Sequence, residues 1–121
     1  MKIISFSWTT AALLQGHKTV TRRSWSPNYA RQFHAGDLVA AYDRSPRYGG
    51  KQVATIRLTQ DPYLENTANM PEADYEAEGL AWMERNTMII QGEWPNAFWD
   101  SWKDDAEDVW VIRFEFVETL R

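Results

Sequence analysis

The segment Val109-Trp-Val-Ile-Arg-Phe-Glu-Phe-Val117 (VWVIRFEFV), close to the end of the 121-residue chain, decides the fold class. Large apolar side chains occupy every second position from Trp110 to Phe116, so they fall on one face of a strand. Four shorter stretches of apolar or β-branched residues precede it, at residues 3–6, 18–23, 38–42 and 52–59. Several short strands closed by one long strand favour a small barrel over an open sheet.

Short helices are expected around these strands. Thr9 is placed to cap a first helix that Gly16 ends in a left-handed conformation, and Ser26 caps a second helix with Pro27 at its first position. The expected helical ranges are 9–16, 26–33, 72–85 and 95–103. A chain of this length builds one core but not two. We therefore expect a single α+β domain over residues 1–121, a small β-barrel of about five to six strands with short flanking helices.

The chain contains no cysteine, which excludes disulfides, thiolate metal sites and cysteine nucleophiles. The absence of cysteine suits a reducing compartment, so we expect a cytoplasmic location. The first residues contain no apolar run long enough for a signal peptide or a membrane span. The two histidines, His17 and His34, lack the spacing of metal ligands, so we expect neither a metal nor another cofactor.

Charge is unevenly distributed along the chain. Residues 1–57 contain nine Lys and Arg against two acidic residues, a balance of +7, whereas residues 58–121 have a balance of −11. Such asymmetry indicates a basic face that binds a polyanion. In the alternative, the two halves fold together and neutralise one another.

Two groups of residues in the acidic second half of the chain are expected to be structural. The acidic residues that alternate over 72–78 are expected to form the polar face of a helix. The aromatic residues at 94–102 are expected to pack as a lid on the barrel, with a docking patch for a partner as the alternative.

Cations and aromatic rings occur together in residues 16–25 (GHKTVTRRSW) and in the loop 44–51 (RSPRYGGK). Cations suit phosphate groups and rings suit bases, so the combination is typical of a site for a single-stranded or flipped-out nucleotide. The expected substrate-binding or nucleic-acid-binding residues are Trp8, Arg22, Arg23, Trp25, Arg44, Arg47, Tyr48 and Lys51. The alternatives are a basic hairpin tip for the loop and core packing for Trp8.

The order of three short motifs resembles a known family. Gly-x-Lys-Thr-x-Thr-x-Arg spans residues 16–23, Phe-x-x-Gly-Asp spans 33–37, and Tyr-x-x-Glu-Gly spans 75–79, ahead of the final aromatic strand. This order resembles the ASCH domain, a family of small PUA-like β-barrels associated with RNA, over nearly the whole chain. The resemblance implies a barrel fold and a nucleotide or RNA partner.

Within that family, the four residues from Lys18 to Thr21 are similar to the Lys-Thr-x-Thr motif of the N4-acetylcytidine amidohydrolases. The resemblance implies catalytic roles for Lys18, for Thr21 and for a helical glutamate, which falls on Glu78 or, as the other candidate, on Glu76. It implies an amidohydrolase that removes an acyl group from N4-acetylcytidine or a related modified pyrimidine nucleoside.

These three residue types suit amide hydrolysis. Thr21 acts as the nucleophile if Lys18 accepts its proton, which requires burial and neighbouring arginines to lower the Lys18 pKa from about 10.4 towards 7–8. Glu78 would then donate a proton to the leaving amine. Residues three apart on a regular strand point to opposite faces, so Lys18 must lie in the turn after Gly16 or beside a bulge to meet Thr21.

Two departures from those enzymes, at residues 22–25 and in the acidic Trp-rich segment 93–108, leave other functions open. The same pocket would serve a non-catalytic RNA-binding or modified-base-reading module. A ribonuclease, in which Lys18 stabilises phosphate charge, is a third alternative that relatives in the ASCH family suggest. In the structural alternative the threonines are ordinary strand residues and Lys18 complements a helix dipole. No feature of the sequence indicates an oligomeric state.

Overall fold

The computed structural model describes residues 1–120 and contains one mixed sheet of six strands. The strands are β1 (Lys2–Ser5), β2 (Val20–Arg23), β3 (Leu38–Tyr42), β4 (Gln52–Leu58), β5 (Tyr63–Asn66) and β6 (Asp108–Thr119). Their order is β1-β3-β4-β6-β2, and β5 pairs with β6 outside this path. Strands β1 and β3 are parallel, and the other pairs are antiparallel.

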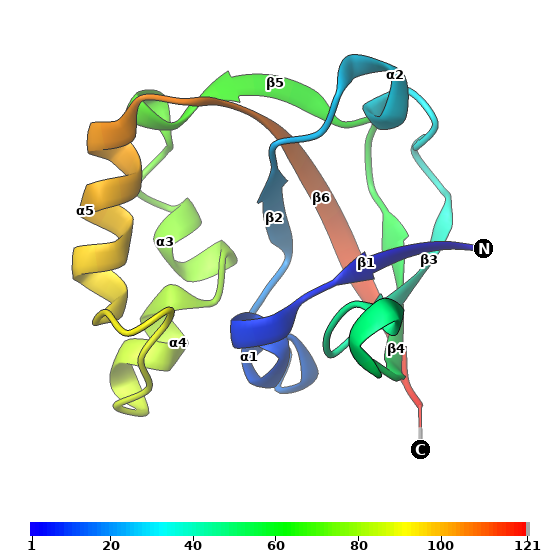
Figure 1. Cartoon of the computed structure of the whole chain (residues 1–121), viewed down its shortest axis with the longest axis horizontal. Coiled ribbons are helices and arrows are strands. Elements are labelled where there is room, and N and C mark those ends of the chain that lie inside the picture. Colours follow the sequence, from blue (N-terminus) through cyan, green and yellow to red (C-terminus); the bar gives the residue numbers. More distant parts are fainter. Residues whose placement is uncertain (121) are drawn as a thin grey trace.

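The long strand β6 organises the sheet. Its second half, from Phe114 to Thr119, pairs with β4, whereas its first half pairs with both β2 and β5. A strand that changes partners along its length lets the sheet curl into a half-barrel (Figure 1). The α+β class and the small curled sheet of five to six strands predicted from the sequence are confirmed.

Short helices flank the sheet, as predicted. They are α1 (Thr10–Leu14), α2 (Pro27–Ala30), α3 (Asp74–Ala77), α4 (Leu80–Arg85) and α5 (Pro95–Asp105), with the 3₁₀ turns η1 (Ser7–Thr9), η2 (Pro46–Tyr48) and η3 (Thr67–Asn69). Helices α3, α4 and α5 gather on one side of the molecule, and α1 and β2 lie between them and the rest of the sheet in the view of Figure 1. Among residues 1–120, no helix is both long and apolar enough to cross a membrane.

The predicted caps are found at two of three positions. Ser26 accepts a hydrogen bond from the Tyr29 N–H, and Pro27 opens α2. Gly16 follows α1 with a φ of +79°. Thr9 precedes α1, but its hydroxyl donates to the Phe6 carbonyl (2.9 Å) and does not cap the helix. Helices α1 and α2 are shorter than the ranges expected from the sequence.

Two elements differ from the sequence-based expectation. The sequence does not predict β5, because Tyr-Leu-Glu-Asn has no alternating apolar pattern; the strand forms by pairing with β6 in the register Tyr63↔Val111. The single helix expected over residues 72–85 is divided into α3 and α4 by Gly79, whose φ is +90°. A left-handed residue interrupts the helical hydrogen-bond ladder, so α4 starts as a separate helix.

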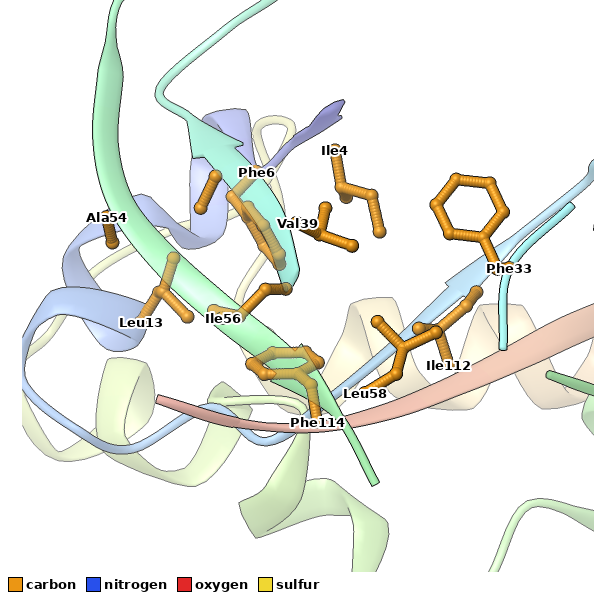
Figure 2. Packing of buried hydrophobic residues seen from close by; sticks show 11 residues of the cluster. Ile4, Phe6, Leu13, Phe33, Val39, Ala54, Ile56, Leu58, Ile112 and Phe114 are labelled. Carbon is orange, nitrogen blue, oxygen red and sulfur yellow. The ribbon is translucent and has the colours of Figure 1, made fainter. Parts of the chain in front are cut away.

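The main core lies inside the curled sheet. Phe6 meets Phe114 edge-on with 5.7 Å between ring centres, and both lie beside Ile56 (Figure 2). The buried cluster comprises Ile4, Phe6, Leu13, Phe33, Val39, Ala41, Ala54, Ile56, Leu58, Ile112 and Phe114. Ile112 and Phe114 come from the face of β6 predicted to be apolar, and Trp110 and Phe116 of the same face pack against the cluster.

A second buried cluster joins the helices to one another. It consists of Ala12, Met70, Leu80, Met83, Ile90 and Trp99. Because Ala12 belongs to α1 and Trp99 to α5, this cluster holds the helical layer against the N-terminal part of the fold. Trp99 is therefore buried among the helices and not in the barrel core, and Trp94 is 55% exposed, so the cluster at 94–102 does not pack on that core as the lid interpretation expected.

Gly79 brings the corner between α3 and α4 against α1. A Cβ atom on Gly79 would lie 2.7 Å from the Ala12 Cβ and 3.4 Å from the Lys18 Cβ. We expect Gly79→Ala to lower the free energy of unfolding by about 2–4 kcal/mol, because left-handed strain adds to overpacking. Urea unfolding measures this change.

Gly92→Ala is the matched control for Gly79→Ala. Gly92 also has a positive φ, +80°, but an added Cβ there meets no atom within 4 Å beyond its chain neighbours. It should therefore lose roughly 1–2 kcal/mol from backbone strain alone. Equal losses at the two positions would show that the contact with Ala12 contributes nothing.

Candidate active site

A cavity of about 640 Å³ lies between β2, which is an edge strand of the sheet, and the helical layer. Its walls come from the corner between β1 and η1, from β2, from the end of α3 and from α5. The polar lining residues that concern the proposed chemistry are Lys18, Thr21, Arg22, Arg23 and Glu78. The three residues predicted as catalytic thus line one cavity.

Lys18 lies in the connection between α1 and β2, before the strand begins at Val20. Backbone hydrogen bonds hold this connection on both sides: the Thr19 N–H donates to the Ala77 carbonyl (2.8 Å), and the Thr19 carbonyl accepts from the Phe114 N–H (3.0 Å). Because Lys18 precedes the regular strand, strand geometry does not direct it away from Thr21. The strand predicted from residue 18 thus starts two residues later, and Lys18 has the first of the two placements that the sequence argument allowed, the turn after Gly16.

Lys18 and Glu78 form a buried pair. Lys18 Nζ donates to Glu78 Oε1 (2.8 Å) and to the Glu78 carbonyl oxygen (2.9 Å), and the two residues are 2% and 4% exposed. Burial lowers the pKa of Lys18 from its ordinary value; Glu78 opposes this effect, and the charges of Arg23 and Arg22 add to it. A lysine whose pKa is lowered gives up its proton nearer neutral pH, as a general base requires.

Arg22 lies at the centre of a buried ion network. Its Nη1 donates to Glu78 Oε2 (2.8 Å). Its Nε donates to Glu65 Oε1 (2.8 Å), and its Nη2 donates to Asp74 Oδ2. Arg113 of β6 binds the same Asp74 carboxylate through Nη1 (3.1 Å) and Nη2 (2.7 Å). The Arg22 side chain has no exposed surface, and each of its three guanidinium nitrogens binds a protein carboxylate.

The network favours the charged forms of Arg22, Asp74 and Arg113. Burial acts to lower the pKa of Arg22, but Glu65, Glu78 and Asp74 outweigh it and raise that pKa. Burial acts to raise the pKa of Asp74, but hydrogen bonds from Arg113 and Arg22 outweigh it and lower that pKa. The hydrogen bond to Asp74 is the main cause that raises the pKa of Arg113.

The network neutralises charge between the two halves of the sequence. With Lys18, it contains three cations and three carboxylates. Lys18 and Arg22 come from the basic half, and their partners Glu65, Asp74 and Glu78 come from the acidic half. For these residues, the basic and acidic halves of the chain fold together and neutralise one another, and no basic face is formed. Arg22 was predicted to bind substrate or nucleic acid; it lines the cavity, but each of its three guanidinium nitrogens binds a protein carboxylate.

Thr21 is engaged by a second arginine. Its Oγ1 accepts a hydrogen bond from Arg23 Nε (3.1 Å), and Arg23 Nη2 donates to the Ser5 carbonyl (2.6 Å). Burial lowers the pKa of Arg23, but a guanidinium stays charged at neutral pH. A cation on Oγ1 stabilises the negative charge that develops when the hydroxyl loses its proton. Lys18 uses two of its three donors on Glu78, which leaves a third to meet a ligand or water in the cavity.

The remaining lining residues include aromatic and acidic side chains. Phe98 and Trp102 of α5 line the cavity together with Trp8 of η1, which is 51% exposed. Trp102 Nε1 donates to Glu107 Oε1 (3.0 Å). The lining carboxylates other than Glu78 are Glu93, Asp105 and Glu107. The cavity is therefore of mixed charge rather than a basic groove.

The other predicted binding residues do not lie at this cavity. Trp25 stacks on Phe33 with 4.5 Å between ring centres and packs against the core, so it lies away from the cavity in which it was predicted to bind a base. The predicted residues of the loop between β3 and β4 are exposed and do not line the cavity either; they are Arg44, Arg47, Tyr48 and Lys51.

The acidic residues over 72–78 do not all form a polar helix face, and that prediction is wrong for two of them. Asp74 and Glu78 are buried because each meets an arginine of the network. Glu76 is exposed and pairs with Arg85 (3.3 Å). Of the two glutamates proposed as the catalytic acid, Glu78 is the one that lines the cavity.

Sequence reasoning missed the part of the network behind Arg22. Arg113 also donates through Nε to the Tyr63 hydroxyl (3.0 Å), and Asp74 and Glu65 complete the set. A signal was present, because Arg113 interrupts the aromatic and aliphatic run of the final strand. Its partners lie 39 or more positions away, so periodicity does not identify them.

No group of three His, Asp or Glu side chains within residues 1–120 is arranged to hold a metal ion. His17 instead stacks on Trp82, with 5.8 Å between ring centres, and lies 3.7 Å from Glu76.

Comparison with known proteins identifies the fold but no family. No family model matches the chain, and no curated protein matches its sequence. Among solved structures, it is similar to the protein EF3133 from Enterococcus faecalis V583, which is described by the family model DUF984. The similarity has a TM-score of 0.60 at 15% identity and covers 99% of this chain and 83% of that chain. The two proteins therefore share an overall fold.

Proposed function

We propose that the protein is a small amidohydrolase that removes an acyl group from N4-acetylcytidine or a related acylated pyrimidine nucleoside. The observation that carries this proposal is the cavity in which a buried Lys18, the Thr21 hydroxyl and Glu78 lie together. The similarity of residues 18–21 to the Lys-Thr-x-Thr motif of the ASCH-type amidohydrolases supports the same residues. The absence of cysteine supports a cytoplasmic location.

The reaction has two halves. Lys18, as a neutral amine, accepts the proton of the Thr21 hydroxyl while Thr21 Oγ1 forms a bond to the acyl carbon. The carbon–nitrogen bond of the amide then breaks, and the Lys18 ammonium returns the proton to the leaving amino group. Water attacks the acyl-threonine with the same proton transfers and releases the carboxylic acid. One amide and one water thus become one amine and one acid.

Glu78 receives an orienting role in this scheme rather than the proton-donating role expected from the sequence. Both of its carboxylate oxygens accept hydrogen bonds from cations, Oε1 from Lys18 and Oε2 from Arg22. A carboxylate held in this way is an acceptor, so the Lys18 ammonium is the better placed donor for the leaving amine. Arg23 supplies the positive charge beside the Thr21 oxygen.

The charges at the cavity favour a nucleoside over a phosphorylated ligand. Glu93, Asp105 and Glu107 line it, and a phosphate brought near them is repelled. The guanidinium of Arg22 offers no compensation, because its donors bind Glu65, Asp74 and Glu78. The aromatic lining suits a flat, uncharged base.

A second candidate, an RNA-binding module, is supported by the loop between β3 and β4. It presents three exposed cations and one exposed ring, namely Arg44, Arg47, Lys51 and Tyr48. A module of this kind binds oligonucleotides with an affinity that falls steeply with salt. A ribonuclease is less well supported, because its phosphate chemistry would take place beside the acidic lining of the cavity.

The test is hydrolysis of N4-acetylcytidine by the purified protein, with products separated by chromatography and the 5′-monophosphate of the same nucleoside run in parallel. We expect release of cytidine, and slower release from the monophosphate. No release at high enzyme concentration contradicts the amidohydrolase. Salt-dependent oligonucleotide binding that is lost in an Arg44→Ala/Arg47→Ala variant would then favour the RNA-binding module.

Trp8→Ala should raise KM for the acylated nucleoside by about tenfold, because stacking of a base on an aromatic side chain contributes about 1–3 kcal/mol. Trp8 is 51% exposed and lines the cavity, so we expect little change in the free energy of unfolding. Trp94→Ala is the control, since Trp94 is 55% exposed and is not a lining residue. An equal rise of KM in both variants would exclude stacking on Trp8. Steady-state kinetics and urea unfolding give the two readouts.

A further inference from the structure

Arg22 takes part in no step of the reaction above, although it is a buried cation that lines the cavity. Its side chain has no exposed surface and makes ion pairs with Glu65, Asp74 and Glu78. Buried ion networks are costly to form, because each charge loses its water. The contribution of this ion network to the site follows from the hydrogen bonds of the Glu78 carboxylate.

The Glu78 carboxylate is divided between two cations. Lys18 Nζ holds Oε1 and Arg22 Nη1 holds Oε2, each at 2.8 Å. Without Arg22, both oxygens would be free to turn to the Lys18 ammonium. A carboxylate that serves one cation stabilises that cation more strongly than a carboxylate that is shared.

Arg22 is itself held from behind, so its position is fixed. Asp74 of α3 and Glu65 of β5 bind its other nitrogens. Arg113 of β6 clamps Asp74 with two hydrogen bonds, of 3.1 and 2.7 Å. Three elements of the fold therefore keep Nη1 directed at Glu78, and a fixed donor fixes the carboxylate that it binds.

We propose that Arg22 is a positioning residue that holds one oxygen of the Glu78 carboxylate, prevents this carboxylate from closing on Lys18, and so leaves Lys18 free to carry protons in the cavity. The link to catalysis rests on the proposed function, whereas the effect on Lys18 does not. Arg22 lies where the sequence departs from the amidohydrolases that it resembles, so the resemblance does not supply this role.

The charged groups that face Lys18 shift its pKa in the directions that the proposal requires. They are Glu78 at the end of α3, which raises the pKa of Lys18, and Arg23 and Arg22 of β2, which lower it. Removal of Arg22 takes away one cation beside Lys18 and releases a carboxylate oxygen to it. Both changes favour the ammonium form.

A charge-balanced double variant tests the inference. Arg22→Gln with Glu65→Gln removes one cation and one carboxylate, so the network keeps equal numbers of each. The matched control is Arg57→Gln with Glu115→Gln, which also removes one cation and one carboxylate but belongs to an exposed pair outside the network. Glu65→Gln alone is the second control.

Two readouts are measured on each variant. The first is the titration of the Lys18 side chain, followed by NMR on protein with ¹⁵N-labelled lysine, which needs no substrate. The second is the pH dependence of kcat and KM for the acylated nucleoside. In Arg22→Gln/Glu65→Gln we expect the Lys18 midpoint to rise by about one pH unit, which lowers the neutral fraction about tenfold. We expect kcat at neutral pH to fall about tenfold, to recover at higher pH, and KM to stay within about twofold.

The controls should keep the wild-type Lys18 midpoint. An unchanged midpoint in folded Arg22→Gln/Glu65→Gln overturns the inference. If the midpoint rises while the wild type hydrolyses no acylated nucleoside, the positioning role stands and the proposed function fails.

Arg22→Lys covers the case in which the double variant does not fold. One ammonium does not reproduce the three separate nitrogens that bind Glu78, Asp74 and Glu65. We therefore expect the proton affinity of Lys18 to rise about threefold, less than in Arg22→Gln/Glu65→Gln. A wild-type midpoint in Arg22→Lys then overturns the inference.

Discussion

We expect Lys18→Met to lower kcat for the acylated nucleoside by about 10³-fold, because loss of a general acid–base group costs roughly 10²–10⁴-fold. Methionine fills a similar volume, which matters because Lys18 is 2% exposed. Glu78 keeps Arg22 as a partner in the variant, so one of its two cations remains. Single-turnover kinetics measure the chemical step, and far-UV circular dichroism confirms that the variant is folded.

Lys18→Arg separates proton transfer from charge. Arginine keeps the positive charge and the donors that Glu78 accepts, but it does not lose its proton at neutral pH. We therefore expect Lys18→Arg to be as inactive as Lys18→Met. Activity retained in Lys18→Arg would mean that Lys18 acts through its charge alone. Lys51→Met, at an exposed position outside the cavity, should behave as the wild type.

Arg22→Met has the largest expected effect on stability. It removes the cation shared by Glu65, Asp74 and Glu78, and Glu65 is left in a partly buried site without that partner. Breaking a buried ion pair from one side costs about 3–5 kcal/mol of unfolding free energy. Chemical denaturation measures the loss. The control is Arg57→Met, whose pair with Glu115 is exposed and should contribute about 0–1 kcal/mol; similar losses in both variants would contradict the network as a source of stability.

The same network makes stability fall in acid. The pKa of Asp74 is lowered in the folded protein from its ordinary value of 3.8. A carboxyl group with a lowered folded pKa contributes stability above its unfolded pKa, and this contribution is lost as pH falls through the folded pKa. We expect the free energy of unfolding to decrease progressively below about pH 4. Asp74→Asn should flatten part of this decrease, as measured by denaturation between pH 2 and pH 6.

Local sequence signals were sufficient for much of the fold. Alternation from Trp110 to Phe116 correctly predicts a strand whose apolar face enters the core. Ser26 and Pro27 correctly predict the start of α2. The strand β5 was not predictable in this way, because it forms by pairing with β6 and its own residues carry no periodic pattern.

Gly79 shows a different limit of sequence reasoning. Helix propensity over residues 72–85 predicts one helix, and a glycine inside a helix is tolerated at a cost of about 1 kcal/mol. The break occurs because the chain packs closely against Ala12, a contact that no local pattern reveals. The sequence left two placements open for Lys18, the turn after Gly16 or a bulge, and the structure has the first because β2 begins only at Val20.

For the site, the motif at residues 18–21 was sufficient to select Lys18 and Thr21 as cavity residues. The motif was not sufficient to predict that Arg22 and Arg23 have different roles. Arg22 and Arg23 are adjacent in sequence, yet one is enclosed by carboxylates and the other binds the Thr21 oxygen. Strand alternation sends neighbouring side chains in different directions, but the partners they meet come from elements far along the chain.

These long separations have a consequence for folding. Lys18 and Glu78 are 60 positions apart, and Arg22 is 43 positions from Glu65 and 52 from Asp74. Contacts of this kind close long loops, whose entropy is lost before the contact contributes, so they form late. The pairing of β2 with β6 also joins distant residues, Thr21 with Ile112, so the site is complete only when most of the chain is in place. We expect no fragment lacking residues 72–79 to assemble the site, because Asp74 and Glu78 come from that segment.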